Sequence, residues 1–329
     1  MPVAHIKPFL EDAKNKKYCL GCFNVFNVET LEGAIEAAIN LQTPVVCAVY
    51  EPQLKFSDLE TFSNLVKDIS NKVNVPLILH LDHASEISSI INAIKCGFTS
   101  LMYDGPVGID FNEKIKRTKQ VVDIVHSVGL MVEAEVGYIT RAGVDENTAE
   151  MNFANLKLAV EFLENTGVDI LAPAIGSVHG LIEQKATLNI ELLKQIREKT
   201  NCFLSLHGGS GVEDNIISMA IDNGINKASV YTKISALAVQ KLKDLLLREP
   251  PDLSIILNEV RQGYKEMIEN RLKAFRSINI CSFQSDVCHL PFNNIYAGAG
   301  SAFKTSEKTG IDIEDIVEKI TREIVSKLI

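Results

Sequence analysis

Residues 77–84 read Leu-Ile-Leu-His-Leu-Asp-His-Ala, a short apolar run that ends with an acid and an imidazole side by side. A run of this length and composition is typical of a buried strand in a parallel sheet. Because side chains alternate along a strand, His80 lies on the opposite face from the leucines beside it, inside the strand layer. Polar residues at the carboxyl end of such a strand, here Asp82 and His83, indicate a functional site.

The rest of the chain repeats this unit. Short apolar runs alternate with amphipathic helical patterns about eight times, which predicts parallel βα units. Eight such units close most simply into a (β/α)₈ TIM barrel. An open doubly wound sheet is the alternative, and it is less favoured because no Gly-x-Gly-x-x-Gly follows the first run. The predicted strands are residues 19–25, 45–49, 77–81, 100–102, 130–136, 170–172, 203–206 and 227–230, and helices are predicted to begin near Thr30, Ser57, Ser85, Asn112, Phe153, Asn189, Glu213 and Lys233.

Composition narrows the class of protein. With 329 residues, 46% hydrophobic and 23% charged, the chain has the balance of a soluble globular protein. The net charge of -9 argues against nucleic acid as a partner. No apolar run approaches the ~20 residues of a membrane span. The start of the chain has no signal-peptide pattern and the cysteines are scattered in apolar runs, so we expect a cytoplasmic protein with free thiols.

Polar residues follow the predicted strands at many exits. They are Asn24, Asp82, His83, Asp104, Glu135, residues 176–180, residues 207–211 and Thr232. In a barrel these positions converge on one rim. Three of the seven histidines, His83, His179 and His207, fall at separate exits. Three imidazoles with an open fourth position are the ligand set of a catalytic Zn²⁺.

Two loops carry further candidates. The run His207-Gly208-Gly209-Ser210-Gly211 precedes a helix, where backbone N–H groups can approach a phosphate, although a flexible βα turn would have the same composition. Its position after the seventh strand favours the phosphate interpretation. Residues 138–152 form a long polar segment that includes Asp145 and Glu146. It is either a lid over the site or a solvated acidic loop.

The C-terminal part departs from the repeat. After the breaker at residues 250–251, a helix is predicted from about Leu253 to Phe275, and residues 1–275 are predicted to form the barrel domain. Residues 276–329 form an extension that ends in an amphipathic helix from about Asp312 to Leu328. The apolar stripe of that helix covers either the barrel wall or another subunit, so we expect a homodimer or homotetramer.

Six motifs in order resemble the class II, metal-dependent fructose-bisphosphate and tagatose-bisphosphate aldolases. They are Phe23-Asn24-Val25 with Glu29-Thr30, Leu81-Asp82-His83, Met102-Tyr103-Asp104-Gly105, Val132-Glu133-Ala134-Glu135-Val136-Gly137, Ile175-Gly176-Ser177-Val178-His179-Gly180 and Leu206-His207-Gly208-Gly209-Ser210-Gly211. The resemblance covers roughly residues 1–275. It implies a lyase that cleaves a sugar phosphate to dihydroxyacetone phosphate and an aldehyde through a zinc-stabilised enediolate.

The resemblance also implies roles for individual residues. His83, His179 and His207 would bind Zn²⁺, with Asp104 and Glu135 as ligands of a second cation or as alternative ligands. Asp82 would move the proton of the C4 hydroxyl, near Asn24, and Asp145 or Glu146 would move the carbon-bound proton. The phosphate of dihydroxyacetone phosphate would lie against Gly180, Gly208, Gly209, Ser210, Gly211, Ser229 and Thr232.

The sequence departs from the family pattern mainly at positions that would bind a second phosphate, at the far end of the substrate. Ser229 replaces the usual Asn, and Ile182 and Glu183 replace the usual Tyr and Lys. Glu51 and Glu183, if they faced the pocket, would repel a phosphate dianion. We therefore expect a ketose 1-phosphate, or a close analogue without a second phosphate, as the substrate, and a ketose bisphosphate is the alternative. Two alternatives stay open: a non-catalytic metal-binding relative, and another lyase or epimerase acting on a phosphorylated ketose.

Overall fold

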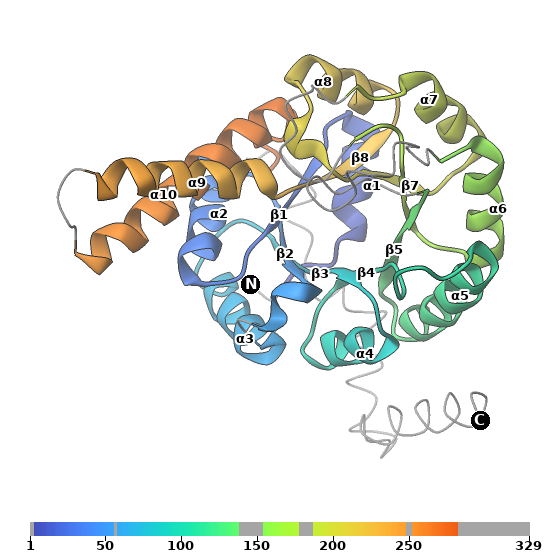
Figure 1. Ribbon diagram of the computed structural model, residues 1–329, viewed down its shortest axis with the longest axis horizontal. Coiled ribbons are helices and arrows are strands. Elements are labelled where there is room, and N and C mark those ends of the chain that lie inside the picture. The colour runs from blue at the N-terminus through green and yellow to red at the C-terminus, as the bar shows by residue number, and fades with distance from the viewer. Residues whose placement is uncertain (1–2, 56–57, 138–153, 178–186, 248–251, 282–329) are drawn as a thin grey trace.

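Eight parallel strands form a closed barrel in chain order, with β1 hydrogen-bonded to both β2 and β8 (Figure 1). The structure is a computed structural model that describes residues 3–55, 58–137, 154–177, 187–247 and 252–281. The strands are β1 (Leu20–Asn24), β2 (Val45–Tyr50), β3 (Leu77–Ala84), β4 (Ser100–Tyr103), β5 (Met131–Val136), β6 (Ile170–Pro173), β7 (Phe203–Leu206) and β8 (Ile225–Val230). The predicted TIM barrel is confirmed, and each predicted strand has a counterpart.

Helices surround this barrel on its outer side, except the N-terminal one (Figure 1). They are α1 (Lys7–Lys16), α2 (Val28–Leu41), α3 (Leu59–Ser70), α4 (Ile87–Lys95), α5 (Phe111–Ser127), α6 (Leu156–Thr166), α7 (Ile190–Lys199), α8 (Asp214–Asp222), α9 (Thr232–Leu246) and α10 (Leu253–Ala274), with short 3₁₀ turns η1 (Glu51–Lys55) and η2 (Gly209–Gly211). Apolar faces of the strands and helices pack together in one continuous core between the two layers.

Side-chain caps explain where several helices begin. The helix predicted near Asn189 begins at Ile190, and Asn189 caps it, because its side chain accepts a hydrogen bond from the Leu192 N–H. The helix predicted near Thr30 begins at Val28, and Thr30 forms a capping box with Asn27. The helix predicted near Ser85 begins at Ile87, and its N-cap is Glu86, because the Ser85 N–H and hydroxyl both donate to the Glu51 carboxylate. A capping residue can lie one turn from the position that pattern alone suggests.

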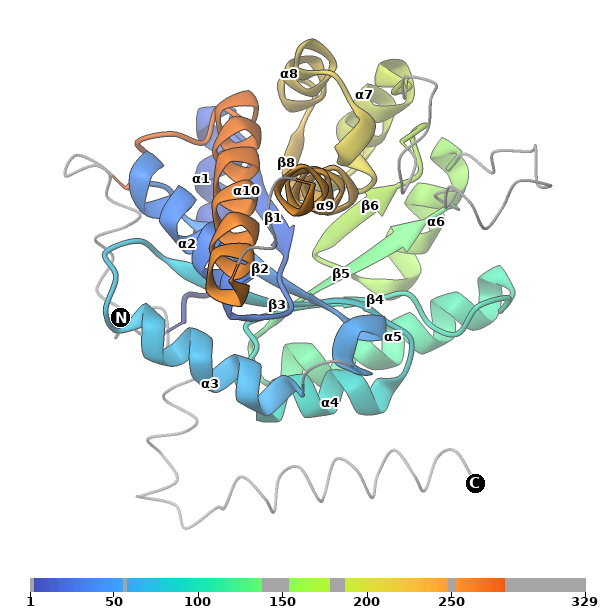
Figure 2. The same ribbon diagram turned by 60° about the vertical axis from the view of Figure 1, so that its left-hand side comes forward.

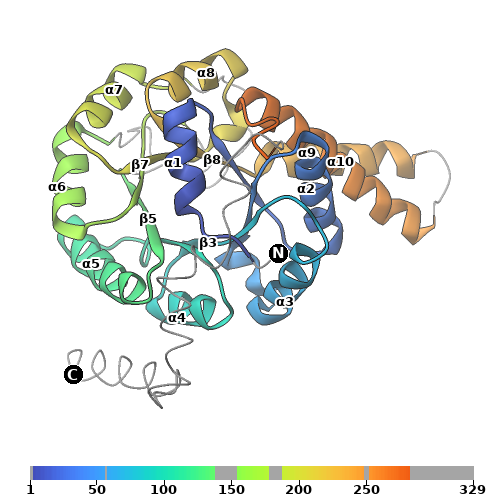
Figure 3. The same cartoon turned by 180° about the vertical axis from the view of Figure 1, so that it is seen from behind.

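The N-terminal helix α1 was not predicted. It crosses the amino-terminal opening of the barrel (Figure 3). Its Phe9 and Leu10 are buried together with Ile6, against inward-facing strand residues such as Leu20 and Ile78. These apolar side chains fill that end of the barrel, so the cavity lies at the opposite, carboxyl end.

Helix α10 runs beside α2 (Figure 2). At Gly33 the two helices approach so closely that an added Cβ would lie 2.6 Å from the Arg261 carbonyl oxygen. The helix predicted from Leu253 to Phe275 is confirmed, and α10 ends one residue earlier, at Ala274. Together α9 and α10 project from the barrel as an arm (Figure 1). No helix in the described ranges is long and apolar enough to cross a membrane.

Two sequence predictions concern the tail and the cysteines. Five described cysteines are free thiols, as expected, but Cys281 at the end of the described chain is disulfide-bonded. The proposed boundary near residue 275 stays a prediction, because residues 282–329, including the expected terminal helix, lie outside the described residues.

Candidate active site

A cavity of about 220 Å³ opens at the carboxyl ends of the strands. Its size suits a small metabolite. The lining residues come from β1, β2, β3, β7 and β8 and from the turns that follow them: Asn24, Tyr50, Asp82, His83, His207, Gly208, Ser210, Ser229, Tyr231 and Thr232. The barrel thus brings together candidates that are up to 208 positions apart in the chain.

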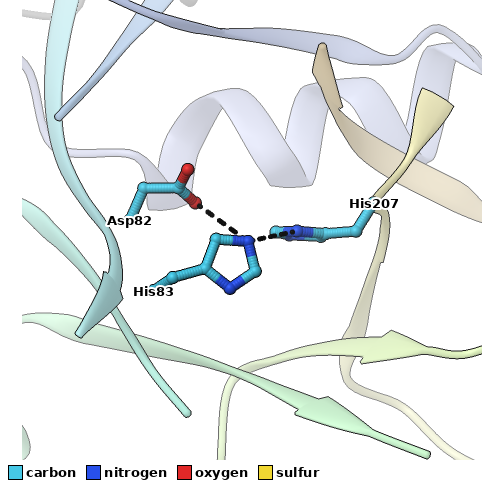
Figure 4. A group of neighbouring side chains, drawn as sticks. All are labelled: Asp82, His83 and His207. Atoms are coloured by element: carbon cyan, nitrogen blue, oxygen red, sulfur yellow. Dashed lines mark hydrogen bonds and ion pairs between the residues drawn. The ribbon is translucent and has the colours of Figure 1, made fainter. Parts of the chain in front are cut away.

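Two of the three predicted metal-binding imidazoles face each other in this cavity (Figure 4). The distance from His83 Nε2 to His207 Nδ1 is 3.3 Å. Two nitrogens bound to one tetrahedral zinc at the usual bond lengths would be about 3.3 Å apart, so this spacing fits a shared ion. Ligand atoms of Asp82, His83 and His207 all lie within 4.8 Å of one another. His179, the third predicted ligand, lies outside the described residues.

An irregular backbone at the end of β3 directs these side chains. The pairing register with β4 shifts between Leu81 and Ala84, and His83 has a φ of 55°. Left-handed backbone is uncommon for a residue with a side chain and recurs at functional sites. Asp82 and His83 therefore lie within β3, not after it as predicted, and the irregularity lets these adjacent side chains both reach the cavity.

A carboxylate contacts the ring of His83 on the side away from His207. Asp104 Oδ2 lies 2.5 Å from His83 Nδ1, the nitrogen that does not face His207. Burial by itself lowers the pKa of His83, but the Asp82 and Asp104 carboxylates raise it to about 10. Ligand atoms of His83, Asp104 and Glu135 form a second group within 4.8 Å. Burial and the nearby Asp104 charge raise the pKa of Glu135.

Asp82 is held in place by an amide. The Asn24 side-chain NH₂ donates to Asp82 Oδ2 at 2.7 Å, while Oδ1 accepts no hydrogen bond within the described residues. Burial raises the pKa of Asp82, but the neighbouring His83 and His207 more than offset this and lower it. The side chain is thus an ionised carboxylate with one oxygen free to accept a proton.

The glycine-rich turn follows His207 directly and also lines the cavity. Gly208 has a φ of 64°, and the 3₁₀ turn η2 follows it before α8 begins. Ser210 Oγ accepts a hydrogen bond from the Tyr231 N–H, which joins this turn to the start of α9. Gly209 and Gly211 belong to the same turn but do not line the cavity.

Two tyrosines that the sequence did not single out as site residues also line the cavity. Tyr50 packs edge-to-face on His83, with ring centroids 5.7 Å apart. The Tyr231 hydroxyl accepts a hydrogen bond from the Gln53 amide at 3.0 Å. Each follows directly after a predicted strand, 45–49 and 227–230, and this position at the rim was the signal that could have found it. Glu51 was expected to repel phosphate if it faced the pocket, but its carboxylate is bound by Ser85 and it does not line the cavity.

Beneath the cavity lies a buried polar layer that was not assigned from sequence. His80, Glu133 and Lys227 are fully buried, and Glu133 contacts both Lys227 and His207. His80 lies inside the barrel as predicted, and burial lowers its pKa to about 3. For Glu133 the signal was its alternation with Glu135, which places both on the inner face. Asp145, Glu146, Gly180 and Glu183 lie outside the described residues.

Comparison with known proteins agrees with this geometry. The sequence model described as fructose-bisphosphate aldolase class-II matches residues 4–280. This chain belongs to the class II fructose-bisphosphate aldolase family. A fructose-bisphosphate aldolase of Staphylococcus aureus is 33% identical over 284 residues, which cover 85% of this chain and 99% of that one.

The protein YdjI of Escherichia coli K12 is 36% identical over 276 residues, which cover 84% of this chain and 98% of YdjI. The crystal structure of the YdjI aldolase matches with a TM-score of 0.75 and 34% identity, and covers 85% of this chain and all of that one. The chain is therefore a class II aldolase, an enzyme that makes or breaks a carbon–carbon bond. Its family is generally zinc-dependent, and the donor set around His83 and His207 fits that ion.

Proposed function

We propose that this aldolase cleaves a ketose 1-phosphate, or a close analogue without a second phosphate, to dihydroxyacetone phosphate and an aldehyde. The observation that carries the proposal is the lining of the cavity. It includes the glycine-rich turn, the first residue of α9, and the side chains of Tyr50 and Tyr231. Within the described part of the chain, no lysine or arginine is among the lining residues.

One phosphate has a suitable place in this cavity. Backbone N–H groups at a glycine turn and at a helix start favour an anion. Gly208, Gly209, Ser210 and Gly211 form the turn, and Thr232 is the first residue of α9. Ser229 and Gly180 complete the set that we assign to the phosphate. The tyrosines instead suit the hydroxyl groups and carbon chain of an unphosphorylated aldehyde.

We assign zinc to His83, His179 and His207, with Asp104 and Glu135 available to a second divalent or monovalent cation. A bound divalent ion would offset the negative charge that develops on the substrate oxygens during cleavage. The 3.3 Å separation of the two described imidazole nitrogens supports this assignment.

Two proton transfers accompany the cleavage. Asp82 would accept the proton of the C4 hydroxyl, because its Oδ1 accepts no hydrogen bond within the described residues while Asn24 holds Oδ2. A second group must protonate the carbon left by the broken bond, and we assign this to Asp145 or Glu146. The two transfers are separate, so they can be measured separately.

A substrate panel tests the proposal on the purified, zinc-loaded enzyme. Ketose 1-phosphates and fructose 1,6-bisphosphate are compared by the rate at which dihydroxyacetone phosphate is released. We expect kcat/KM to be higher for a monophosphate, and release to stop when a chelator removes the zinc. Efficient cleavage of the bisphosphate, well above every monophosphate, would overturn the substrate assignment. Conversion of a ketose phosphate to its isomer without release would instead identify an epimerase.

We also propose that the enzyme is a homodimer or homotetramer. The arm formed by α9 and α10 exposes several large apolar side chains: Leu237, Val239, Leu246, Leu247, Leu253 and Ile255. Exposed apolar side chains gathered on one feature are typical of an interface. Light scattering on the full chain measures the mass directly, and a monomer at micromolar concentration would contradict this part of the proposal.

A further inference from the structure

The buried polar layer beneath the cavity connects directly to the metal site. Glu133 on β5 and Lys227 on β8 are both fully buried, and Glu133 Oε2 accepts from Lys227 Nζ at 2.7 Å. The other carboxylate oxygen, Oε1, lies 2.8 Å from His207 Nε2. Lys227 Nζ also lies 3.3 Å from the Ser229 hydroxyl, which lines the cavity.

The hydrogen bonds between Lys227, Glu133 and His207 allow one arrangement of their protons. A lysine ammonium only donates hydrogen bonds, so the Glu133 carboxylate accepts from it. A carboxylate that is held in this way is an acceptor on both oxygens, so the nitrogen facing Oε1 must donate. His207 therefore carries its proton on Nε2. The lone pair of the neutral ring is then on Nδ1, the nitrogen that lies 3.3 Å from His83 Nε2.

We propose that Glu133 and Lys227 are positioning residues of the metal site, which select the His207 tautomer whose Nδ1 is unprotonated and can bind the ion. Lys227 acts through Glu133, because it keeps the carboxylate charged and holds its second oxygen. This inference rests on the zinc site proposed above. It assigns to these residues a role that differs from ligation, since Glu133 contacts the nitrogen of His207 that faces away from His83.

A purely structural role for the ion pair would have a different consequence. Replacing a buried ion pair by uncharged side chains of similar volume is often neutral for stability. A carboxylate behind a metal-bound histidine, by contrast, changes metal affinity by roughly 10–100-fold. Zinc affinity therefore separates the two roles, while the melting temperature of the metal-free protein reports the fold.

Two double variants form a matched pair for this test. Glu133→Gln with Lys227→Met removes both charges but retains an amide oxygen that can accept from His207. Glu133→Met with Lys227→Met has nearly the same volume and no acceptor there. Neither variant leaves a buried charge without its partner. Zinc affinity is measured by competition with a chromophoric chelator.

We expect the variant with Gln to bind zinc within a few-fold of the wild-type affinity, and the variant with Met to bind it roughly 10–100-fold more weakly. Equal affinities in the two variants would overturn the inference. The nitrogen-15 spectrum of the metal-free wild-type enzyme, labelled in its histidines, gives a check that needs no variant. His207 should be protonated on Nε2, and an Nδ1-protonated ring would also overturn the inference.

The outcomes distinguish this inference from the function on which it rests. A wild-type enzyme that binds no divalent ion would contradict the proposed zinc site. A wild-type enzyme that binds zinc tightly, with both double variants binding it equally well, would contradict only the role of Glu133 and Lys227.

Discussion

Replacement of Asp82 by asparagine tests the assignment of the two proton transfers. Asparagine has the same shape, and its side-chain oxygen can still accept the hydrogen bond that Asn24 donates at 2.7 Å. The substitution therefore leaves the packing intact and removes the ability to take a proton. It also removes the charge beside His83, so the zinc content of the variant has to be measured along with its activity.

The expected loss follows from what one positioned base contributes. General acid–base catalysis is worth roughly 10²–10⁴-fold in rate. That corresponds to about 3–5 kcal/mol of activation free energy. We expect Asp82→Asn to lower kcat for release of dihydroxyacetone phosphate by this factor at unchanged zinc content.

A second reaction of the same variant gives the sharper measurement. Exchange of a carbon-bound proton of dihydroxyacetone phosphate with deuterated water involves only the carbon, which we assign to a different acid. Exchange, followed by proton NMR, should stay within a few-fold of wild type. Asp58→Asn is the matched control, because Asp58 caps α3 outside the cavity and asparagine caps equally well.

Two results would refute this reasoning. If Asp82→Asn cleaves its substrate at a rate within tenfold of wild type with full zinc content, Asp82 is not the base for the hydroxyl. If cleavage and exchange fall by the same factor, one group serves both steps and the division of roles is wrong.

The remaining predictions concern metal uptake, the pH dependence of stability, and helix packing. The pKa of His83 in the metal-free protein is about 10, because Asp82 and Asp104 outweigh the effect of burial, so zinc must displace a proton at neutral pH. Zinc affinity should therefore rise with pH toward 10. Titration calorimetry at pH 7–8 in buffers of different ionisation enthalpy should show about one proton released per zinc. Zinc binding without proton release would contradict this prediction. The raised pKa also stabilises the metal-free fold fully below pH ~6.5 and loses this contribution as pH rises through about 10. Gly33→Ala should destabilise the fold by roughly 1–2 kcal/mol, because its Cβ would lie 2.6 Å from a backbone oxygen of α10 and the gain in helix propensity offsets only part of that strain. In Gly263→Ala the added Cβ would lie 3.5 Å from its nearest neighbour, so this substitution should instead stabilise α10 by up to about 1 kcal/mol. The free energy of unfolding of both variants is measured in urea, and changes of the same sign in the two would contradict the packing argument.

Local patterns were informative wherever one strand or one helix carried the signal. The eight apolar runs were visible because each strand buries both faces, and a βα repeat leaves few alternatives to a closed barrel. His83 and His207 were recognised as partners although 124 residues separate them, since strand ends in a barrel converge on one rim. Helix α1 was missed because it precedes the first strand and belongs to no repeating unit.

The contacts between side chains could not be predicted from the sequence. Nothing in the sequence near Glu51 indicates that Ser85 binds its carboxylate. The structure shows this contact, which holds the Glu51 carboxylate against Ser85. Likewise Glu133 and Lys227 are 94 positions apart. Their pairing depends on the register and stagger of the closed barrel, which no local pattern encodes.

The sequence by itself determined the fold class, the family and the rim at which we place the chemistry, because alternation and strand-end polar residues are properties of short segments. Only the tertiary structure decided which nitrogen of each imidazole faces the other, which carboxylate stands behind it, and which charges are paired inside the barrel. Those choices depend on distances of about 3 Å between strands that meet only after the barrel has closed.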